Sequence, residues 1–215
     1  MYELGAAFSG VEVEEGTNLL VEGPPMSGKR ELGFQILADG VEHGEGAIVV
    51  TTKDSADRVL EDFAEVAGVE NPTVGVVDCV TKQQGMGNRR ESDLVRYASS
   101  PNDLTGIGIE LSELLRAFYE QRGARKNRIL LHSLSTLLMY SDLQTVFRFL
   151  HVFTGRVQSA DALGVFIIDS SAHDEQTVSP LKQLFDGIVT VREDDDGDFE
   201  GRLMGVDGGT EWRSL

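Results

Sequence analysis

Short apolar runs alternate along this chain with segments in which apolar residues recur every three or four positions. The runs are rich in branched side chains and short enough for buried strands, whereas the longer spacing is typical of one face of a helix. The predicted strands are 17–22, 47–52, 73–79, 128–133 and 163–169. The predicted helices run through 32–40, 55–67, 107–118 and 142–157. Strands separated by helices indicate an α/β protein with a mostly parallel sheet covered on both faces.

Local signals refine the ends of these elements. Asp54 and Asp142 each precede a predicted helix, and an aspartate there accepts hydrogen bonds from the unpaired amides of the first turn. We therefore predict both as N-caps. The segment from Val80 to Thr105 is polar and follows neither period, so we predict a long loop there.

The last part of the chain returns to alternating patterns. Residues 187–192 and 202–206 alternate, with the acidic run from Asp194 to Asp198 between them, which predicts a hairpin with an acidic turn. Residues 210–213 add a predicted edge strand. A calcium-binding loop would need glycine where Phe199 stands, so no calcium site is expected. With no repeat or linker visible, we expect a single domain over 1–215, in which 184–215 extend the sheet as a hairpin.

The stretch GPPMSGKR lies between the first predicted strand and the first predicted helix. It fits the phosphate-binding pattern G-x-x-x-x-G-K-[ST] at every position except the last. In such a loop the main-chain amides turn toward a phosphate and the lysine reaches the β- and γ-phosphates. The predicted nucleotide-binding residues are Gly23, Pro24, Pro25, Met26, Ser27, Gly28, Lys29 and Arg30. The alternative is a strand-to-helix turn that keeps this shape and binds nothing.

Hydrolysis in this class of protein needs groups that this chain replaces. The final loop position normally supplies a hydroxyl for Mg²⁺, and Arg30 cannot ligate a cation. The strand expected to carry the magnesium aspartate ends in His132, and the second strand leads to Lys53 and Asp54. Asp169 ends the fifth strand and is a candidate sensor. No catalytic residue and no metal ligand is therefore assigned, and His132 is expected to be a neutral histidine.

The order of these parts resembles the RecA superfamily, and most of all the single-domain relatives of the clock ATPase KaiC. In that family the loop reads like GTPGTGKT, and here Lys29-Arg30 leads to Gln35-Ile36-Leu37 and Gly40. The family's paired glutamates align with Lys53 and Asp54, and its VIDSLS strand aligns with LLHSLS, residues 130–135. The stretch SSPNDLTGIGI, residues 99–109, resembles a subgroup found in haloarchaea.

The resemblance implies a RecA-like P-loop NTPase fold with sheet order 3-2-4-5-1 in the predicted strands and antiparallel C-terminal strands beside strand 1. It also implies an ATP or other nucleotide ligand and leaves open whether Mg²⁺ accompanies it. Because the metal and catalytic positions are degenerate, the first hypothesis is a regulatory or signalling pseudo-ATPase. Cationic Lys29, Arg30 and Lys53 would then replace part of the magnesium charge. The alternatives are an active ATPase with a rearranged metal site using Asp54 or Asp169, and an interaction scaffold without nucleotide.

Charge narrows the expected surroundings and partners. The 215 residues carry 36 acidic and 19 basic side chains, a net charge of -17 spread along the whole chain. Such surfaces are typical of proteins from salt-rich cytoplasm, and they oppose nucleic-acid binding, which needs a basic face. Arg89 and Arg90 form the one basic doublet of note in a predicted loop. A homo-oligomer or a regulatory protein partner fits the family better than nucleic acid.

Other reactive residues lack a supporting pattern. No apolar run is long enough to cross a bilayer and no signal-peptide pattern is present, so a cytoplasmic protein without membrane contact is expected. The lone Cys79 excludes an internal disulfide and is expected to be buried. Ser170, His173 and Asp174 suggest a nucleophilic triad, but no nucleophile-elbow motif accompanies them.

Overall fold

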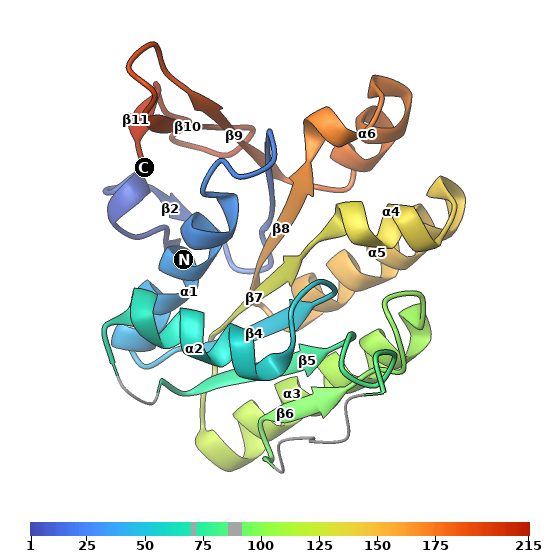
Figure 1. Cartoon of the computed structure of the whole chain (residues 1–215). Coiled ribbons are helices and arrows are strands. Elements are labelled where there is room, and N and C mark those ends of the chain that lie inside the picture. Colours follow the sequence, from blue (N-terminus) through green and yellow to red (C-terminus); the bar gives the residue numbers. More distant parts are fainter. Residues whose placement is uncertain (70–71, 86–91) are drawn as a thin grey trace.

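A nine-stranded sheet between two layers of helices forms the centre of the molecule (Figure 1). The computed structural model describes residues 1–69, 72–85 and 92–215. The strands are β1 (Tyr2–Glu3), β2 (Glu12–Val13), β3 (Asn18–Gly23), β4 (Gly46–Thr51), β5 (Val74–Asp78), β6 (Val95–Tyr97), β7 (Asn127–His132), β8 (Leu163–Asp169), β9 (Gly187–Glu193), β10 (Phe199–Met204) and β11 (Arg213–Ser214). The helices are α1 (Lys29–Glu42), α2 (Ala56–Ala67), α3 (Leu104–Arg122), α4 (Leu134–Tyr140), α5 (Leu143–Ser159) and α6 (Glu175–Lys182), with 3₁₀ turns at Ala6–Phe8 and Ser170–Ala172.

The order of the central strands is the one the sequence predicted. The sheet runs β6-β5-β4-β7-β8-β3-β9-β10-β11, so the predicted strands follow one another as 3-2-4-5-1. The six strands from β6 to β3 are parallel, as expected for strands joined by helical crossovers. One detail differs: β9 joins β3 in parallel, and antiparallel pairing begins only between β9 and β10. The helix α6 makes this parallel return possible, because it lies between β8 and β9 along the chain.

Two local expectations need correction, and one helix was missed. The segment 80–105 contains the short strand β6, which extends the sheet beyond β5. The N-cap of α2 is Ser55, whose hydroxyl accepts from the amide of Arg58, and not Asp54. The helix α4, which no pattern predicted, follows β7 directly. The predicted cap Asp142 is confirmed, since its carboxylate accepts from the amide of Thr145 at 2.9 Å. The doublet Arg89-Arg90 lies outside the described residues.

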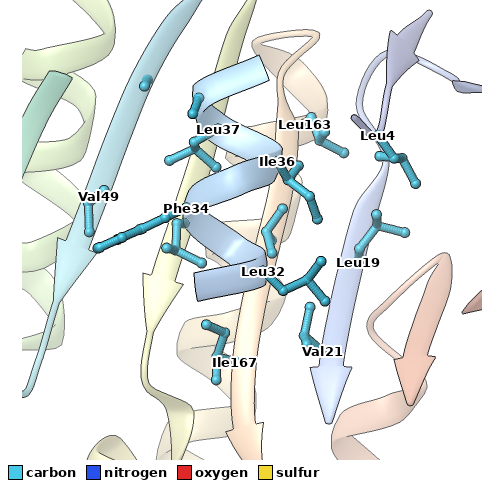
Figure 2. Packing of buried hydrophobic residues seen from close by; sticks show 14 of the residues in the cluster. Leu4, Leu19, Val21, Leu32, Phe34, Ile36, Leu37, Val49, Leu163 and Ile167 are labelled. Atoms are coloured by element: carbon cyan, nitrogen blue, oxygen red, sulfur yellow. The ribbon is translucent and has the colours of Figure 1, made fainter. Parts of the chain in front are cut away.

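Alternate residues of the buried strands face opposite layers of helices. Leu19 and Val21 of β3 belong to the cluster shared with α1 and α2, whereas Leu20 belongs to the cluster shared with α3, α4, α5 and α6. In Figure 2, Leu32 and Ile36 are on the side of α1 toward β3, and Ile36 lies near Leu163 of β8. Burial of apolar side chains on both faces explains why the strands appear in the sequence as continuous apolar runs. Among the described residues, no helix combines the length and the apolar character required to cross a bilayer.

The helix that follows the loop is held in place by a buried arginine. Arg128 of β7 is 1% exposed and donates from Nε to Glu45 and from Nη1 to the carbonyl of Ile36, each at 2.6 Å. Its side chain passes directly against Gly40, where a β-carbon would lie 2.7 Å from Arg128 Cδ and 2.8 Å from Glu45 Oε2. The glycine near the end of α1 is therefore required by packing against a buried ion pair.

Gly40→Ala is expected to destabilise the protein by about 1–3 kcal/mol, because the added methyl group overpacks a buried site. The control is Gly155→Ala in α5, where a β-carbon meets no atom within 4 Å and alanine should stabilise the helix by about 1 kcal/mol. Free energies of unfolding from urea titration measure both changes. Equal effects of the two substitutions would contradict the packing role of Gly40.

Candidate functional site

The candidate site lies at the edge of the sheet where β3, β4, β7 and β8 end. A cavity of about 670 Å³ opens there and is lined by the loop residues from Pro25 to Arg30. The same cavity is lined by Lys53, Asp54, His132 and Asp169, so the structure brings together the residues that the sequence singled out on three other strands. Parallel strands end at one edge of a sheet, and this edge is the usual ligand side of an open α/β fold.

The first two loop residues, Gly23 and Pro24, lie outside this lining. A β-carbon at Gly23 would lie 2.6 Å from the carbonyl oxygen of Val191 in β9, so this glycine has a packing reason of its own. Gly28 is different, because it has a positive φ of 73° at the N-cap of α1 and meets almost nothing. The left-handed conformation at Gly28 gives the loop its turn into the helix.

The main-chain amides of the loop are free to bind an anion. Within the described ranges 1–69, 72–85 and 92–215, no acceptor takes a hydrogen bond from the amides of residues 26–31. Met26 has a positive φ of 60° and its side chain points into solvent. Consecutive amides at the start of a helix, next to the positive end of the helix dipole, form a site for a phosphate or carboxylate.

Lys29 is buried and fully engaged within the chain. Its side chain is 4% exposed, and its ammonium group donates to the carbonyl of Pro24 and to Ser27 Oγ and lies 3.0 Å from Asp169 Oδ1. Ser27 Oγ in turn donates to Pro24 O at 2.8 Å. The three N–H donors of the ammonium group thus have three acceptors. A phosphate that reached Lys29 would have to displace one of them.

Arg30 turns away from the loop toward α2. Its Nη1 lies 2.5 Å from Asp62 Oδ2, its Nε lies 3.6 Å from Asp54 Oδ2, and its guanidinium stacks on the Phe34 ring at 4.6 Å. Burial alone would raise the pKa of Asp62, but the hydrogen bonds from Arg30 and Arg58 outweigh it and hold the pKa below its ordinary value. The charge of Arg30 is therefore largely neutralised, unlike the free charge that the sequence suggested.

His132 is a neutral side chain that faces the cavity. Burial, reinforced by the charge of Arg30, lowers its pKa from 6.5 to about 4. The residue is 8% exposed, and its ring makes no hydrogen bond to any described residue. The nearest opposite charge is Asp54, whose Oδ2 lies 3.8 Å from Nδ1. The ring is thus an unpartnered polar group beside the loop, available as a donor or an acceptor to a ligand.

The residues present do not fit a magnesium ion. Arg30 replaces the hydroxyl ligand, His132 replaces the aspartate, and Asp54 and Asp169 each lie beside a cation of the chain. Over the described part of the chain, no three His, Cys, Asp or Glu side chains gather closely enough to hold a metal. Oxygen ligands are what Mg²⁺ requires, and here they are already committed to ion pairs.

Several lining residues of the cavity were missed from the sequence, among them two charged residues of α2. Arg58 and Asp62 of α2 line the cavity and connect it to Arg30. Their spacing of four positions on one helix indicated an ion pair on the helix surface, which they form at 2.9 Å. Nothing in the sequence indicated that Arg30, 32 positions away from Asp62, would join them.

Three other groups have structural roles. Asp174 caps α6 by accepting from the amide of Thr177 at 2.8 Å, which accounts for one member of the suggested triad. Asp194 accepts from the amides of Asp196 and Asp198 and so closes the acidic hairpin turn. Cys79 is buried, and burial raises the pKa of its thiol, so it is not a reactive thiolate.

Comparison with known proteins supports the fold more than the chemistry. A family model described as a family of unknown function (DUF7504) matches residues 16–191. The UPF0273 protein PAE3143 of Pyrobaculum aerophilum is 26% identical over 198 residues, which are 89% of this chain. They are 66% of that protein, so the chain spans just under two thirds of its length.

A solved structure provides the comparison of folds. The crystal structure of the uncharacterized protein PH0321 from Pyrococcus horikoshii, in complex with an unknown peptide, matches with a TM-score of 0.67. The match covers 92% of this chain and 86% of that chain at 13% identity. At this identity the likeness concerns the fold alone. Together with the strand order, it identifies the fold as RecA-like, as the sequence predicted.

His132 is expected to make stability depend on pH. Its folded pKa of about 4 is below its ordinary value of 6.5, so the stability it contributes as a neutral ring is lost as the pH falls through this range. Wild-type protein should therefore lose about 2 kcal/mol more than His132→Asn between about pH 7.5 and about pH 5, measured as the free energy of unfolding in urea. His43→Asn should show the opposite sign, because Asp39 raises the pKa of His43. Identical pH dependence of wild type and His132→Asn would refute a neutral buried His132.

Proposed function

The chain belongs to the family of unknown function DUF7504, and we propose that it is a RecA-like nucleotide-binding protein that acts by binding and not by efficient ATP hydrolysis. The observation that carries this proposal is the set of unengaged loop amides next to Lys29 in a cavity of about 670 Å³. A cavity of this size is sufficient for a nucleotide. Phosphate-binding loops bind their ligand through such amides.

The residues of the cavity suggest how a nucleotide is held. The loop amides and Lys29 would bind the phosphates, Lys53 is exposed on the side of β4 with no carboxylate of the described residues within ion-pair distance, and the neutral ring of His132 supplies a further polar contact. Because no set of oxygen ligands is free, we infer that binding does not require Mg²⁺. The missing metal charge and the missing catalytic carboxylate are the reasons to expect slow hydrolysis or none.

The regulatory role is suggested by the ion pairs that a bound nucleotide would disturb. Lys29 is paired with Asp169, and Arg30 connects the loop to Asp62 of α2. A bound polyphosphate competes for both cations and would therefore shift the balance between two arrangements of β8 and α2. The size of that shift is set by how much better the ligand binds one arrangement than the other.

The finer identity is part of the same proposal. We infer a KaiC-like subgroup of haloarchaeal type from the loop, the helix glycine Gly40, and the stretch 99–109, and the net charge of -17 is consistent with a salt-rich cell. A regulatory protein partner or a second copy would read the nucleotide state. PH0321, which has a similar fold, was crystallised in complex with an unknown peptide, and this supports a protein partner over nucleic acid.

An interaction scaffold without nucleotide is the second candidate. The complete set of acceptors around Lys29 favours it, because the ammonium group needs no ligand to be satisfied. An active ATPase is the third candidate and would need Asp54 or Asp169 released from its ion pair to orient water.

The first test is a titration with a fluorescent ATP analogue in molar KCl, with and without Mg²⁺. We expect binding of similar affinity in both conditions, and loss of binding in Lys29→Ala. Lys182→Ala is the matched control, because Lys182 is also ion-paired, to Glu22, but lies outside the cavity. Absence of binding in both conditions supports the scaffold, and phosphate release that depends on Mg²⁺ and Lys29 supports the active ATPase.

The second test concerns Asp169 as the competitor of phosphate. Asp169→Asn is expected to tighten binding of the ATP analogue by about tenfold, because it removes the charge that holds Lys29. Glu31→Gln controls for charge, since Glu31 also lines the cavity but has no partner cation among the described residues. Its effect should remain under about twofold. Weaker binding by Asp169→Asn would mean instead that Asp169 contacts the ligand directly.

A further inference from the structure

A second hollow, separate from the nucleotide cavity, lies between α3 and α5. It has a volume of about 330 Å³, and its lining residues come only from these two helices. They are Leu104, Thr105, Gly108, Ile109, Thr145, Arg148, Phe149, Val152, Phe153 and Arg156. This surface, called the α3–α5 groove below, shares no residue with the loop cavity.

The groove is basic in a strongly acidic protein. Its lining contains Arg148 and Arg156 and no carboxylate. The helix α5 has no acidic residue over its 17 positions, although the chain has 36 such residues in 215. Arg148 is exposed and forms no ion pair within the described ranges. Because these two arginines have no carboxylate beside them in the groove, this part of the surface is positively charged on a protein that is otherwise strongly acidic.

The groove also exposes apolar side chains. Ile109 of α3 is 53% exposed and Val152 of α5 is 55% exposed, while Phe149 lies half-buried between the two helices. Exposed branched side chains that gather around a hollow, beside cations, are typical of surfaces that bind partners.

The floor of the groove depends on a glycine. Arg156 crosses from α5 and donates from Nη1 to the carbonyl of Gly108 and, at 3.1 Å, to Ser112 Oγ. A β-carbon at Gly108 would lie 2.7 Å from the same nitrogen. Gly108 belongs to the stretch 99–109 that the sequence singled out, and Asp103 of that stretch caps α3. This stretch therefore builds one wall of the groove, which the nucleotide cavity does not explain.

We propose that the α3–α5 groove docks an acidic amphipathic segment of a protein partner. Apolar side chains of the segment would contact Ile109 and Val152, while its carboxylates would pair with Arg148. A segment that lays its apolar face into a groove between helices is a common form of peptide recognition. A membrane surface fits less well, because a broad lipid surface cannot enter a hollow between two helices. Nucleic acid fits less well because its long run of phosphates would extend beyond the two arginines onto the surface of a protein of net charge -17, whereas a short segment stays within the groove.

The test begins with a phage-displayed random peptide library, selected on the full chain at the lowest KCl concentration that keeps it folded. We expect enriched peptides to combine aspartate or glutamate with apolar residues at helical spacing. The affinity of a synthetic enriched peptide is then measured by calorimetry. Arg148→Glu should weaken it by about tenfold or more.

Two variants separate groove binding from general charge effects. Arg116→Glu makes the same charge change on an exposed arginine of α3 outside the groove, and should alter the affinity by less than about twofold. Ile109→Ser leaves the charge unchanged and should weaken binding as Arg148→Glu does. A peptide with its acidic residues replaced by lysine should bind Arg148→Glu better than wild type, which a variant that merely fails to fold cannot reproduce.

Several outcomes would overturn the proposal. They are the absence of any enriched sequence, enrichment of basic peptides, or equal affinity of the enriched peptide for wild type and Arg148→Glu. Sedimentation analysis gives one more: if wild type forms a dimer that Arg148→Glu converts to monomer, the occupant is a second copy of this chain. Nucleotide binding is measured separately, so failure of the groove leaves the loop proposal untouched.

Discussion

At the edge of the sheet where the loop lies, the buried Lys29 and the half-buried Arg30 each have a carboxylate beside them, and the arrangement of the site depends on this pairing. Lys29 lies against Asp169, and Arg30 lies against Asp62. A cation removed from water without a partner costs several kcal/mol, so these pairs hold the loop, β8 and α2 in one arrangement. The charges of Lys29 and Arg30 are therefore balanced without a ligand. An anion that binds the loop has to exchange partners with these two cations, whereas Lys53 has no carboxylate of the described residues within ion-pair distance.

The loop cavity and the α3–α5 groove are formed by helices on opposite faces of the sheet. The loop cavity is lined by α1 and α2, whereas the groove belongs to α3 and α5 on the other face of the sheet. They have in common that each contains cations in a chain dominated by acids. With most of the surface negative, a few exposed arginines and lysines are enough to direct which partner approaches and where.

The sheet was predictable because strands buried on both faces leave continuous apolar runs, and the resemblance supplied their order. The strand β6 was not predictable, since it has only three residues, of which Val95 alone is buried, and leaves no apolar run to detect. Adjacent Asp54 and Ser55 are both good N-caps, and only the fold decides between them. The grouping of the candidate side chains followed from parallel strands ending together. The ion-pair partners of Lys29 and Arg30 could not be predicted, because contacts between residues far apart in sequence leave no local pattern.

Gly23 and Gly28 are required for different structural reasons, so their substitution has different consequences in evolution. Gly23 must stay small because the carbonyl of Val191 occupies the space of its β-carbon, whether or not anything binds the loop. Gly28 faces open space and is needed only for the direction in which the amides turn. In a related protein that no longer bound a ligand, substitution of Gly28 would therefore be tolerated, whereas substitution of Gly23 would still be selected against. A related protein that keeps Gly23 but has another residue in place of Gly28 would therefore be expected to have lost the ligand.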